Sequence, residues 1–406
     1  MCENKRKPDI RFQGFTDDWE QRKLGEMSTS FEYGLNAAAK DYDGTNKYIR
    51  ITDIDDYSRE FSQEDVTSPD ADLSKAEAYK LSEGDILFAR TGASVGKSYI
   101  YRASDGLVYY AGFLIRAKIK PEYNPEFVFQ NTLTSDYEKF IKVTSMRSGQ
   151  PGVNAQEYSQ FEIRVPSKAE QDEIATYFRS LDNLITLQQR KCDKLVNVKK
   201  SMLEKMFPRE GAKVPEIRFE GFTDDWEQRK LGECFTERKE SMPEGELISV
   251  TIGEGIKKFS ELGRHDNSND DKSKYKKVCV GDIAYNSMRM WQGASGYSPY
   301  EGIVSPAYTV LSPITDVVDS KCISYLFKRS DMTHVFQMNS QGITSDNWNL
   351  KYPALSEIEI MVSPYLAEQH KIAAYLSRID NLITLQQRKL EKLKNIKKSM
   401  LEKMFV

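Results

Sequence analysis

The sequence predicts an α+β fold in which two pseudo-repeated, mixed α/β domains are separated by two long antiparallel coiled-coil helices. Three features support this prediction: an internal repeat, an apolar heptad near the end of each repeat, and short apolar runs between the repeated segments. The 406 residues suffice for two or three domains, because one domain commonly takes about 100–200 residues.

The internal repeat consists of two pairs of matching segments. PDIRFQGFTDDWEQRKLGE at 8–26 returns as PEIRFEGFTDDWEQRKLGE at 215–233, with 17 of 19 positions identical. The segment 170–207 returns at 368–405 with 27 of 38 positions identical, and both copies contain DNLITLQQRK and KKSMLEKMF. The interiors between these segments diverge, which suits one scaffold carrying two different surfaces. A recent duplication that is still drifting would not concentrate its divergence there.

The interiors of the repeats, 27–166 and 234–363, hold short apolar runs broken by Gly, Asn and Pro. Such runs predict strands in a mixed α/β domain with long loops. The stretches Phe127–Phe140 and Cys322–Phe336 are expected to be helical. The repeating units are 1–207 and 208–406, and the expected parts are globular domains at 1–169 and 208–367 and long helices at 170–207 and 368–406.

Each long helix carries an apolar row with a seven-residue period, which is the seam of a coiled coil. At 1.5 Å per residue, each helix would span roughly 57 Å. Because the two helices are near-copies in one chain, we expect them to pair with each other, antiparallel if a two-fold axis relates the units. The expected core of the helix pair is Ile174, Leu181, Leu184, Gln188, Leu195, Met202, Ile372, Ile379, Leu382, Gln386, Leu393 and Met400.

Side chains beside this row widen the apolar stripe of the first helix. Tyr177, Leu184 and Val198 lie three residues after members of the row. A further set that broadens the stripe is Phe178, Ile185, Cys192 and Met206. Gln188 and Gln386 interrupt the row near the helix midpoints. Either they are buried and fix the register, or they are partly exposed at a loose part of the seam; the sequence leaves both open.

Composition and motifs exclude several classes of protein. The net charge is −3, so binding to nucleic acid would have to depend on local arrangement. No apolar run approaches the roughly 20 residues of a membrane helix, and the N-terminus lacks a signal peptide, so we expect a cytoplasmic protein. The five cysteines are scattered without a CxxC pair, which suits a reducing compartment and argues against zinc.

Gly92, Gly96 and Lys97 resemble a phosphate-binding loop, but only three residues separate the glycines where that loop needs four. There is no HExxH spacing, and no Asn-Pro-Pro-aromatic or Asp-Pro-Pro-aromatic motif for gripping an adenine. We therefore expect no catalytic residues, no metal and no cofactor.

The chain resembles the specificity subunit of type I restriction–modification systems over its whole length. The resemblance depends on the duplicated GFTDDWEQRKLGE segment, the Pro-x-x-x-Glu-Gln start of each long helix at Pro166 and Pro364, the repeated DNLITLQQRK and the stretch EGDILFARTG. It implies two target-recognition domains that each read half of a split double-stranded DNA target. It also implies assembly with two methyltransferase subunits and with motor-nuclease restriction subunits, to which the methyl donor and ATP would belong.

Residues expected to contact DNA are polar side chains beside glycines that permit close approach. In the first half these are Arg90, Thr91, Ser94, Lys97, Ser98, Arg147, Gln150 and Asn154. In the second half these are Asn286, Ser287, Arg289, Trp291, Gln292, Gln341, Thr344, Ser345 and Asn347.

Two other functions remain possible from the sequence. A coiled-coil adaptor that binds only proteins would explain the helices but not the divergent Gly- and Arg-bearing loops. A nucleotide-dependent enzyme would depend on the imperfect loop at Gly92. A non-catalytic subunit that recognises DNA explains more of the sequence than either.

Overall fold

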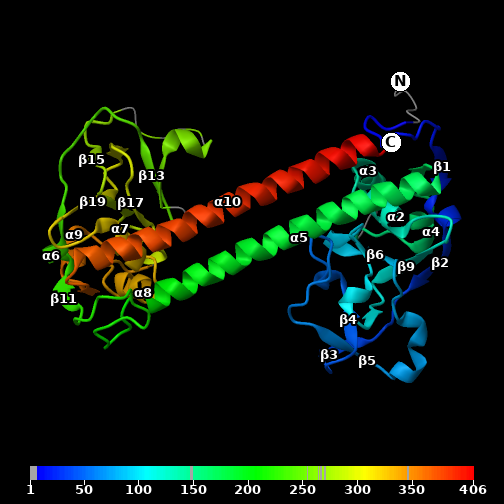
Figure 1. Ribbon diagram of the computed structural model, residues 1–406, viewed down its shortest axis with the longest axis horizontal. Coiled ribbons are helices and arrows are strands. Elements are labelled where there is room, and N and C mark those ends of the chain that lie inside the picture. The colour runs from blue at the N-terminus through cyan, green and yellow to red at the C-terminus, as the bar shows by residue number, and fades with distance from the viewer. Residues whose placement is uncertain are drawn as a thin grey trace. The chain divides into compact units, whose positions relative to one another are not determined.

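The computed structural model describes residues 7–146, 150–253, 255–263, 265, 268, 271–344 and 347–406. The chain forms two compact units. Unit 1 comprises Met1–Arg190 and Gln387–Val406, and unit 2 comprises Lys191–Gln386. Each unit contains one mixed α/β domain and a part of both long helices (Figure 1). Among the helices described, none is both long and apolar enough to cross a membrane.

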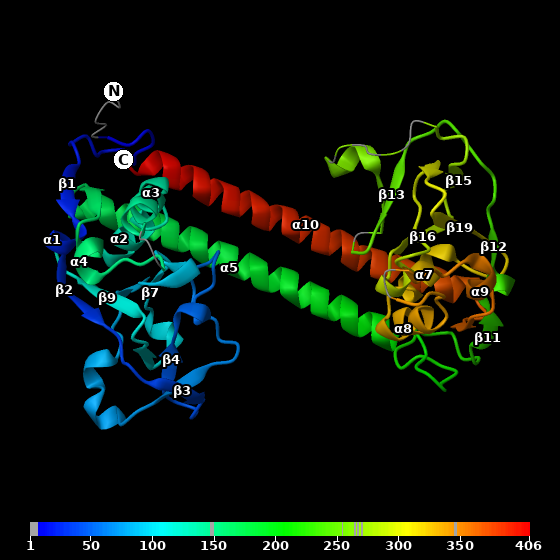
Figure 2. The same ribbon diagram turned by 180° about the vertical axis from the view of Figure 1, so that it is seen from behind.

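Unit 1 is built on a four-stranded antiparallel sheet in the order β2-β9-β6-β7. Its central strand β6, Ile86–Ala89, is buried on both faces: Ile86 and Phe88 face one core, while Leu87 and Ala89 face another. β1, α1 and β2 follow one another along one side of the unit (Figure 2). The elements are β1 Glu20–Lys23, α1 Leu24–Met27, β2 Ser28–Tyr33, β3 Ala38–Asp41, β4 Lys47–Ile49, β5 Thr67–Asp70, β6 Ile86–Ala89, β7 Ser98–Ile100, β8 Val108–Tyr110, β9 Leu114–Ile119, α2 Pro125–Asn131, α3 Ser135–Thr144, α4 Ala155–Ser159 and β10 Glu162–Val165.

Unit 2 repeats this plan with the sheet β12-β19-β16-β17. Its central strand β16 alternates in the same way, with Ile283 and Tyr285 in one core and Ala284 in the other. The elements are β11 Glu227–Lys230, α6 Leu231–Cys234, β12 Phe235–Glu237, β13 Ile248–Thr251, β14 Gly255–Lys258, β15 Lys276–Val278, β16 Ile283–Asn286, β17 Ser295–Tyr297, β18 Gly302–Val304, β19 Tyr308–Pro313, α7 Ser320–Leu326, α8 Ser330–Met338, α9 Tyr352–Ser356 and β20 Glu359–Val362.

The two long helices are α5, Lys168–Lys205, and α10, Leu366–Met404. In unit 1 the end of α10 packs beside the start of α5, with the rings of Phe405 and Phe178 5.6 Å apart. An ion pair of 2.6 Å joins Lys397 to Asp182 further along. Unit 2 contains the matching pair Lys199–Asp380 at 2.5 Å. Within each unit the two helices are therefore antiparallel, and the mixed α/β domains with paired helices confirm the predicted fold class.

The repeated segments 8–26 and 215–233 each begin with a strap, a short stretch of chain that joins the two helices. In unit 1, Arg11 makes two hydrogen bonds of 2.7 Å to the buried Glu170, and Ile10 N donates to Lys403 O at 2.9 Å. In unit 2, Arg218 binds Glu368 at 2.7 and 2.9 Å, and Ile217 N donates to Lys205 O at 2.8 Å. Because these contacts are the same in both units, they explain why this segment repeats so closely.

The glutamine that follows each of these glutamates ties the helix start to a second helix. The buried Gln171 accepts a hydrogen bond from Asn124 N, the N-cap of α2, at 3.0 Å. The buried Gln369 accepts one from Asp319 N, the N-cap of α7, at 2.8 Å. The repeated Glu-Gln pair is therefore structural: the glutamate binds the arginine of the strap, and the glutamine binds the start of a helix in the mixed α/β domain.

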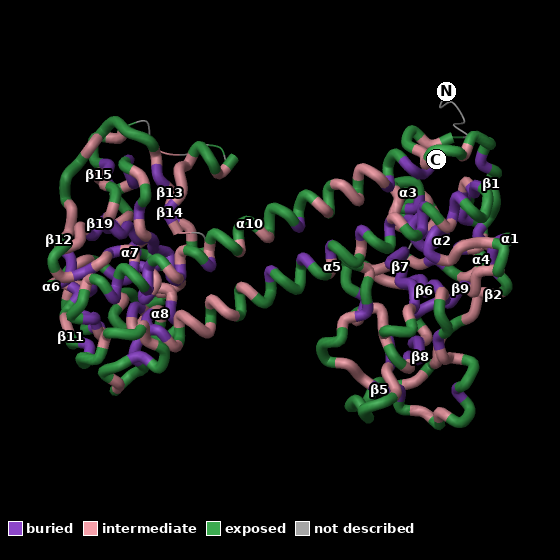
Figure 3. Tube along the Cα trace, in the orientation of Figure 1, coloured by how far each residue is buried: buried purple, intermediate pink, exposed green. Residues whose placement is uncertain are grey.

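The helix seam differs from the expected core at one row. Its first row is correct in part: Ile174, Leu181, Gln188, Ile372 and Ile379 are buried, while Leu195, Met202, Gln386, Leu393 and Met400 are half-buried. The prediction that Leu184 and Leu382 lie in this core is wrong, because their side chains are 52% and 45% exposed. The second buried row contains Phe178, Ile185 and Cys192, four residues after the first row rather than three. Buried positions alternate along α5 with this 4-3 spacing (Figure 3).

Candidate nucleic-acid interface

The turn after β6 brings together the two segments of unit 1 that were expected to contact DNA. Arg90 N donates to Phe113 O at 3.1 Å, and Arg90 O accepts from Val153 N at 2.9 Å. Gly92 N donates to Pro151 O at 3.1 Å. These backbone bonds place the stretch that begins at Arg90 next to the stretch 150–154.

The side chains there form a mixed polar and aromatic surface, which we name cluster 1. The guanidinium of Arg90 lies 5.1 Å from the centre of the Tyr33 ring. Asn154 is exposed and caps α4 by accepting a hydrogen bond from Glu157 N at 2.9 Å. Cluster 1 comprises Tyr33, Arg90, Thr91, Ser94, Phe113, Gln150 and Asn154.

Two expected DNA contacts in this region are wrong, because their side chains are buried. Lys97 Nζ donates to Ile54 O at 2.9 Å and pairs with Asp56 at 2.5 Å, so it anchors a neighbouring loop. Ser98 lies on β7 and its Oγ shares a 2.6 Å hydrogen bond with the hydroxyl of Thr132. Arg147, a further expected contact, lies outside the described residues.

Sequence reasoning missed the aromatic members of cluster 1. Phe113 is 63% exposed and Tyr33 is 44% exposed. The apolar run Phe113-Leu114-Ile115 predicts a strand that includes Phe113, but β9 begins at Leu114, which leaves Phe113 in the preceding turn. An exposed aromatic ring beside an arginine is typical of a surface that binds another molecule.

Unit 2 contains the same backbone arrangement, with Ser287 and Leu350 each 197 residues after their unit 1 counterparts, Arg90 and Val153. Ser287 O accepts from Leu350 N at 2.8 Å, as Arg90 O does from Val153 N. Ser287 N donates to Ala307 O at 3.4 Å, as Arg90 N does to Phe113 O. The second pair of expected segments is thus also brought together.

The side chains of this second surface, cluster 2, differ in chemistry from those of cluster 1. Trp291 and Trp348 meet edge to face with ring centres 5.2 Å apart, and Trp291 Nε1 donates to Met288 O at 3.1 Å. The exposed Arg289 donates to Gln292 at 3.3 Å. Cluster 2 comprises Asn286, Met288, Arg289, Trp291, Gln292, Gln341, Ile343, Thr344, Asn347 and Trp348.

The prediction that Ser287 of unit 2 contacts DNA is wrong, because this side chain is buried and its Oγ shares a 2.9 Å hydrogen bond with the hydroxyl of Thr309. Ser345 lies outside the described residues. Two apolar side chains were missed: Trp348 and the 98% exposed Ile343.

A half-buried lysine supports the backbone of cluster 2. Lys328 Nζ donates to Gly293 O at 2.7 Å and to Ile252 O at 3.1 Å. Burial, together with the charge of Lys199, lowers the pKa of Lys328 to about 8. In unit 1 the equivalent carbonyl, Gly96 O, accepts from the hydroxyl of Tyr137 at 2.9 Å.

Both clusters present hydrogen-bond donors, amides and apolar groups from a turn fixed by backbone bonds. Such a surface can read base edges, since arginine donors suit guanine, amides suit adenine and apolar groups suit the thymine methyl. Among the described residues, no group of three or more His, Cys, Asp or Glu side chains is placed to hold a metal ion.

The chain belongs to a known family of DNA-recognition proteins. The model of the type I restriction modification DNA specificity domain matches residues 16–197 and 223–395, so the chain carries this domain twice. The resemblance inferred from the repeated segments is thereby confirmed. The class of protein is a specificity subunit, which recognises DNA and is not itself the catalytic component.

Two curated relatives from Methanocaldococcus jannaschii match nearly the whole chain. The putative type I restriction enzyme MjaX specificity subunit is 23% identical over 407 residues, covering 95% of this chain and 92% of the relative. The type I restriction enzyme MjaVIII specificity subunit is 22% identical over 418 residues, covering 95% and 91%. The solved S subunit of a type I restriction–modification system from M. genitalium has a TM-score of 0.60 at 14% identity, covering 98% of this chain and 99% of that one, which shows the shared fold.

Proposed function

We propose that this chain reads an asymmetric, bipartite target in double-stranded DNA, with one half-site contacted by each cluster. The supporting observation is that the two clusters occupy equivalent backbone positions but present different side chains. Cluster 1 presents Arg90, Gln150 and Asn154, whereas cluster 2 presents Arg289, two tryptophans and a different set of amides. One geometry with two chemistries fits a target whose two halves differ in sequence.

Within this proposal the exposed and half-buried polar residues contact bases and the glycine-rich backbone permits close approach. Arg90 and Arg289 would read guanine, and Gln150, Asn154, Gln341 and Asn347 would supply amides. Thr91, Ser94, Asn286, Thr344 and Gln292 complete the proposed contacts. Arg147 and Ser345 remain proposed on the sequence alone.

The experiment is to map methylated adenines in cells that carry the full chain and in cells whose chain has 234–363 replaced by the matching part of another family member. Only one half-site should change. A change in both half-sites, or in neither, would contradict the assignment of one half-site to each domain.

A fragment 1–207 provides a second test of the same proposal. Unit 1 needs the end of α10, where Phe405 packs on Phe127 with ring centres 5.5 Å apart and also on Trp19. The end of α5 has the same sequence, KKSMLEKMF, so a second fragment can supply it. We expect a homodimer that selects an inverted repeat of the first half-site. A monomer, or a dimer selecting the original asymmetric target, would contradict it.

We also propose that each helix docks one methyltransferase subunit through its exposed leucines. Leu184 and Leu187 on α5 are 52% and 51% exposed, and the copies Leu382 and Leu385 on α10 are 45% and 48% exposed. Both pairs lie in the identical DNLITLQQRK, so two equal surfaces would accept two equal subunits. Restriction subunits would join this assembly, and the methyl donor and ATP would bind to the partners.

Aspartate substitutions on the two faces of α5 test this docking. Leu184→Asp should leave the fold intact and abolish binding of one methyltransferase subunit, as measured by sedimentation. Asn197→Asp, at an exposed position of α5 about 140° around the helix from Leu184, is the matched control. Unchanged assembly of Leu184→Asp would contradict the docking site. A gel shift with the methyltransferase present separates this function from that of an adaptor that binds only proteins, for which no DNA shift is expected.

A further inference from the structure

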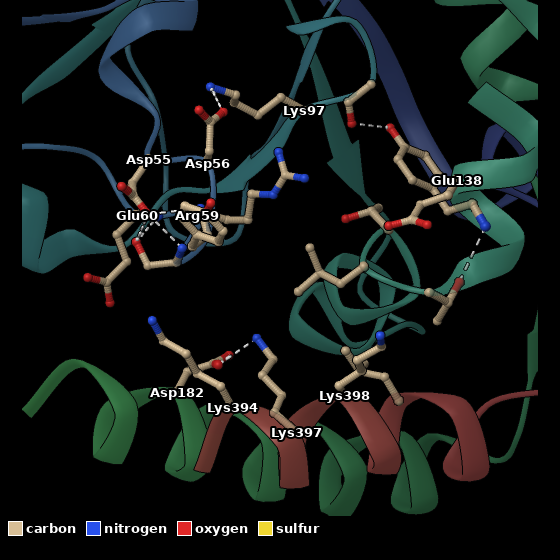
Figure 4. Close-up of a pocket in the computed structure, with 18 of the residues that line it drawn as sticks. Asp55, Asp56, Arg59, Glu60, Lys97, Glu138, Asp182, Lys394, Lys397 and Lys398 are labelled. Atoms are coloured by element: carbon tan, nitrogen blue, oxygen red, sulfur yellow. Dashed lines mark hydrogen bonds and ion pairs between the residues drawn. The ribbon is translucent and has the colours of Figure 1, made fainter. Parts of the chain in front are cut away.

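Unit 1 contains a cleft of about 1280 Å³ that the proposed base readers do not fill. One wall is the hairpin formed by residues 54–61, another is the stretch 93–97 that continues from cluster 1, and the floor is formed by α5 and α10. Every residue that lines the cleft belongs to unit 1. Figure 4 shows the hairpin on one side and the lysines of α10 on the other.

The hairpin is held in place from three directions. Lys97 binds Ile54 O and Asp56, as described above. Thr186 of α5 donates to Glu60 at 2.8 Å, and Lys394 of α10 lies 5.8 Å from the centre of the Tyr57 ring. The hairpin tip is therefore fixed between the domain and both helices rather than free in solvent.

Arg59, at this fixed tip, is in an unfavourable state. Its φ is 60°, a left-handed conformation that costs a side-chain-bearing residue roughly 1–2 kcal/mol. It is half-buried, and among the described residues its guanidinium makes no hydrogen bond or ion pair. Burial lowers its pKa although Asp55, Asp56 and Glu138 oppose this. In Figure 4 its side chain extends into the open space of the cleft. A strained and poorly solvated cation of this kind indicates an anionic ligand.

Further cations surround the same space. Lys142, Arg190, Lys394 and Lys398 line the cleft. Two of the lining carboxylates are already neutralised, Asp56 by Lys97 and Asp182 by Lys397. The other carboxylates that line it are Asp55, Glu60, Glu138 and Glu402.

We infer that this cleft holds the phosphate backbone of DNA beside the first half-site, with Arg59 as its central contact. The inference rests on the proposed function, because the wall at 93–97 continues directly from the base readers of cluster 1. A strand whose bases face Arg90 would carry its backbone along this wall. Arg59 therefore contributes affinity that does not depend on base sequence, whereas Arg90 contributes discrimination.

The test uses the full chain with its methyltransferase subunits, a short labelled duplex of arbitrary sequence, and fluorescence anisotropy across a range of salt concentrations. Arg59→Gly removes the guanidinium but suits the positive φ, so the hairpin should keep its shape. We expect weaker binding to every duplex, a slope of log K against log salt that flattens by about 1, and a raised Tm of the free protein. Lys389→Ala, an exposed α10 position that does not line the cleft, is the control and should leave the slope unchanged.

Other outcomes overturn the inference in distinguishable ways. If Arg59→Gly binds DNA as the unmodified complex does, the cleft is not a phosphate contact, while the proposed function stands. If the unmodified complex binds no duplex, the proposed function fails and this inference fails with it. If ATP raises the Tm of the unmodified protein but not of Arg59→Gly, and does not compete with the duplex, the cleft belongs to a small phosphate ligand instead of DNA.

Discussion

The turns that carry the two clusters have the same backbone arrangement, but different side chains donate the hydrogen bond that supports each turn. In unit 1, Gly96 O accepts a hydrogen bond from the Tyr137 hydroxyl at 2.9 Å; in unit 2, the equivalent Gly293 O accepts one from the Lys328 ammonium at 2.7 Å. Both glycines have positive φ, 85° and 78°. The acceptor and the backbone shape are common to the two units, and only the donor differs.

This difference separates what the scaffold requires from what each unit can vary. Backbone bonds and buried joints recur at fixed offsets, including the strap contacts to Glu170 and Glu368. The surface of each turn, and even the side chain that supports it, has changed. A recognition protein can therefore alter its target while keeping the frame that positions the readers.

Removing the glutamate that binds the strap should lower the stability of both units by the same amount. Glu170→Ala and Glu368→Ala each leave a largely buried arginine without its partner, which should cost about 4 kcal/mol in the affected unit. Hydrogen exchange, measured for the two units separately, gives the two losses. Glu20→Ala, which removes an exposed pair with Arg22, should change stability by less than about 0.5 kcal/mol. Clearly unequal losses for Glu170 and Glu368 would mean that the two frames are not equivalent.

Replacing Gly96 and Gly293 by alanine should lower the stability of the two units by different amounts. A Cβ on Gly96 would lie 2.7 Å from Ile141 Cγ2, whereas a Cβ on Gly293 would meet Thr333 Cγ2 at 3.6 Å. Both alanine variants suffer the left-handed strain, but only Gly96→Ala adds overpacking, so we expect losses of about 3 and about 1 kcal/mol. Denaturant melts of the two variants, read by exchange in each unit, measure this. Equal losses would show that Ile141 moves aside freely.

Substitutions of the two proposed base-contacting arginines should each affect one half-site of the DNA target. Arg90→Ala should weaken discrimination at one half-site, and Arg289→Ala at the other, each by about 2 kcal/mol, because an arginine–guanine contact supplies roughly that much. Binding is measured on duplexes with single base changes in each half-site. A loss that is the same for all sequences would reassign that arginine to a phosphate contact.

The smallest expected difference between the two units is in how their stability depends on pH. Burial raises the pKa of the Tyr137 hydroxyl, so its brace stays neutral through mildly alkaline pH. The folded pKa of Lys328 is about 8, below the ordinary 10.5, so the folded state loses this proton first. Its contribution to the stability of unit 2 therefore rises with pH between about 8 and 10.5, since the unfolded state binds more protons there.

Because Lys328 is only partly buried, this gain should be about 1 kcal/mol. Lys328→Met should abolish it, and Tyr137→Phe should leave the pH dependence of unit 1 unchanged between pH 7 and 9. Melts of both variants across this range check the prediction. A flat profile for the unmodified unit 2 would show that Lys328 is not the group that titrates.

The helix seam shows how far a pattern can be read from sequence. The period of seven placed Ile174, Leu181 and Gln188 correctly in the buried row. It could not decide whether the companion row lay three or four residues later, because both Leu184 and Ile185 are apolar. The partner helix settles this: its register, fixed by Lys397–Asp182, buries Ile185 and leaves Leu184 exposed.

The sequence by itself determined the family, the duplicated plan and the two pairs of segments that form the clusters, because repetition and glycine placement are local properties of the chain. Only the tertiary structure decided that Lys97, Ser98 and Ser287 are buried while Phe113 and Ile343 are exposed. Burial depends on which distant segment lies above a side chain, and residues adjacent in sequence on a strand or turn point to opposite sides. The same reason hid Arg59, whose significance comes from a cleft assembled by segments far apart in the chain.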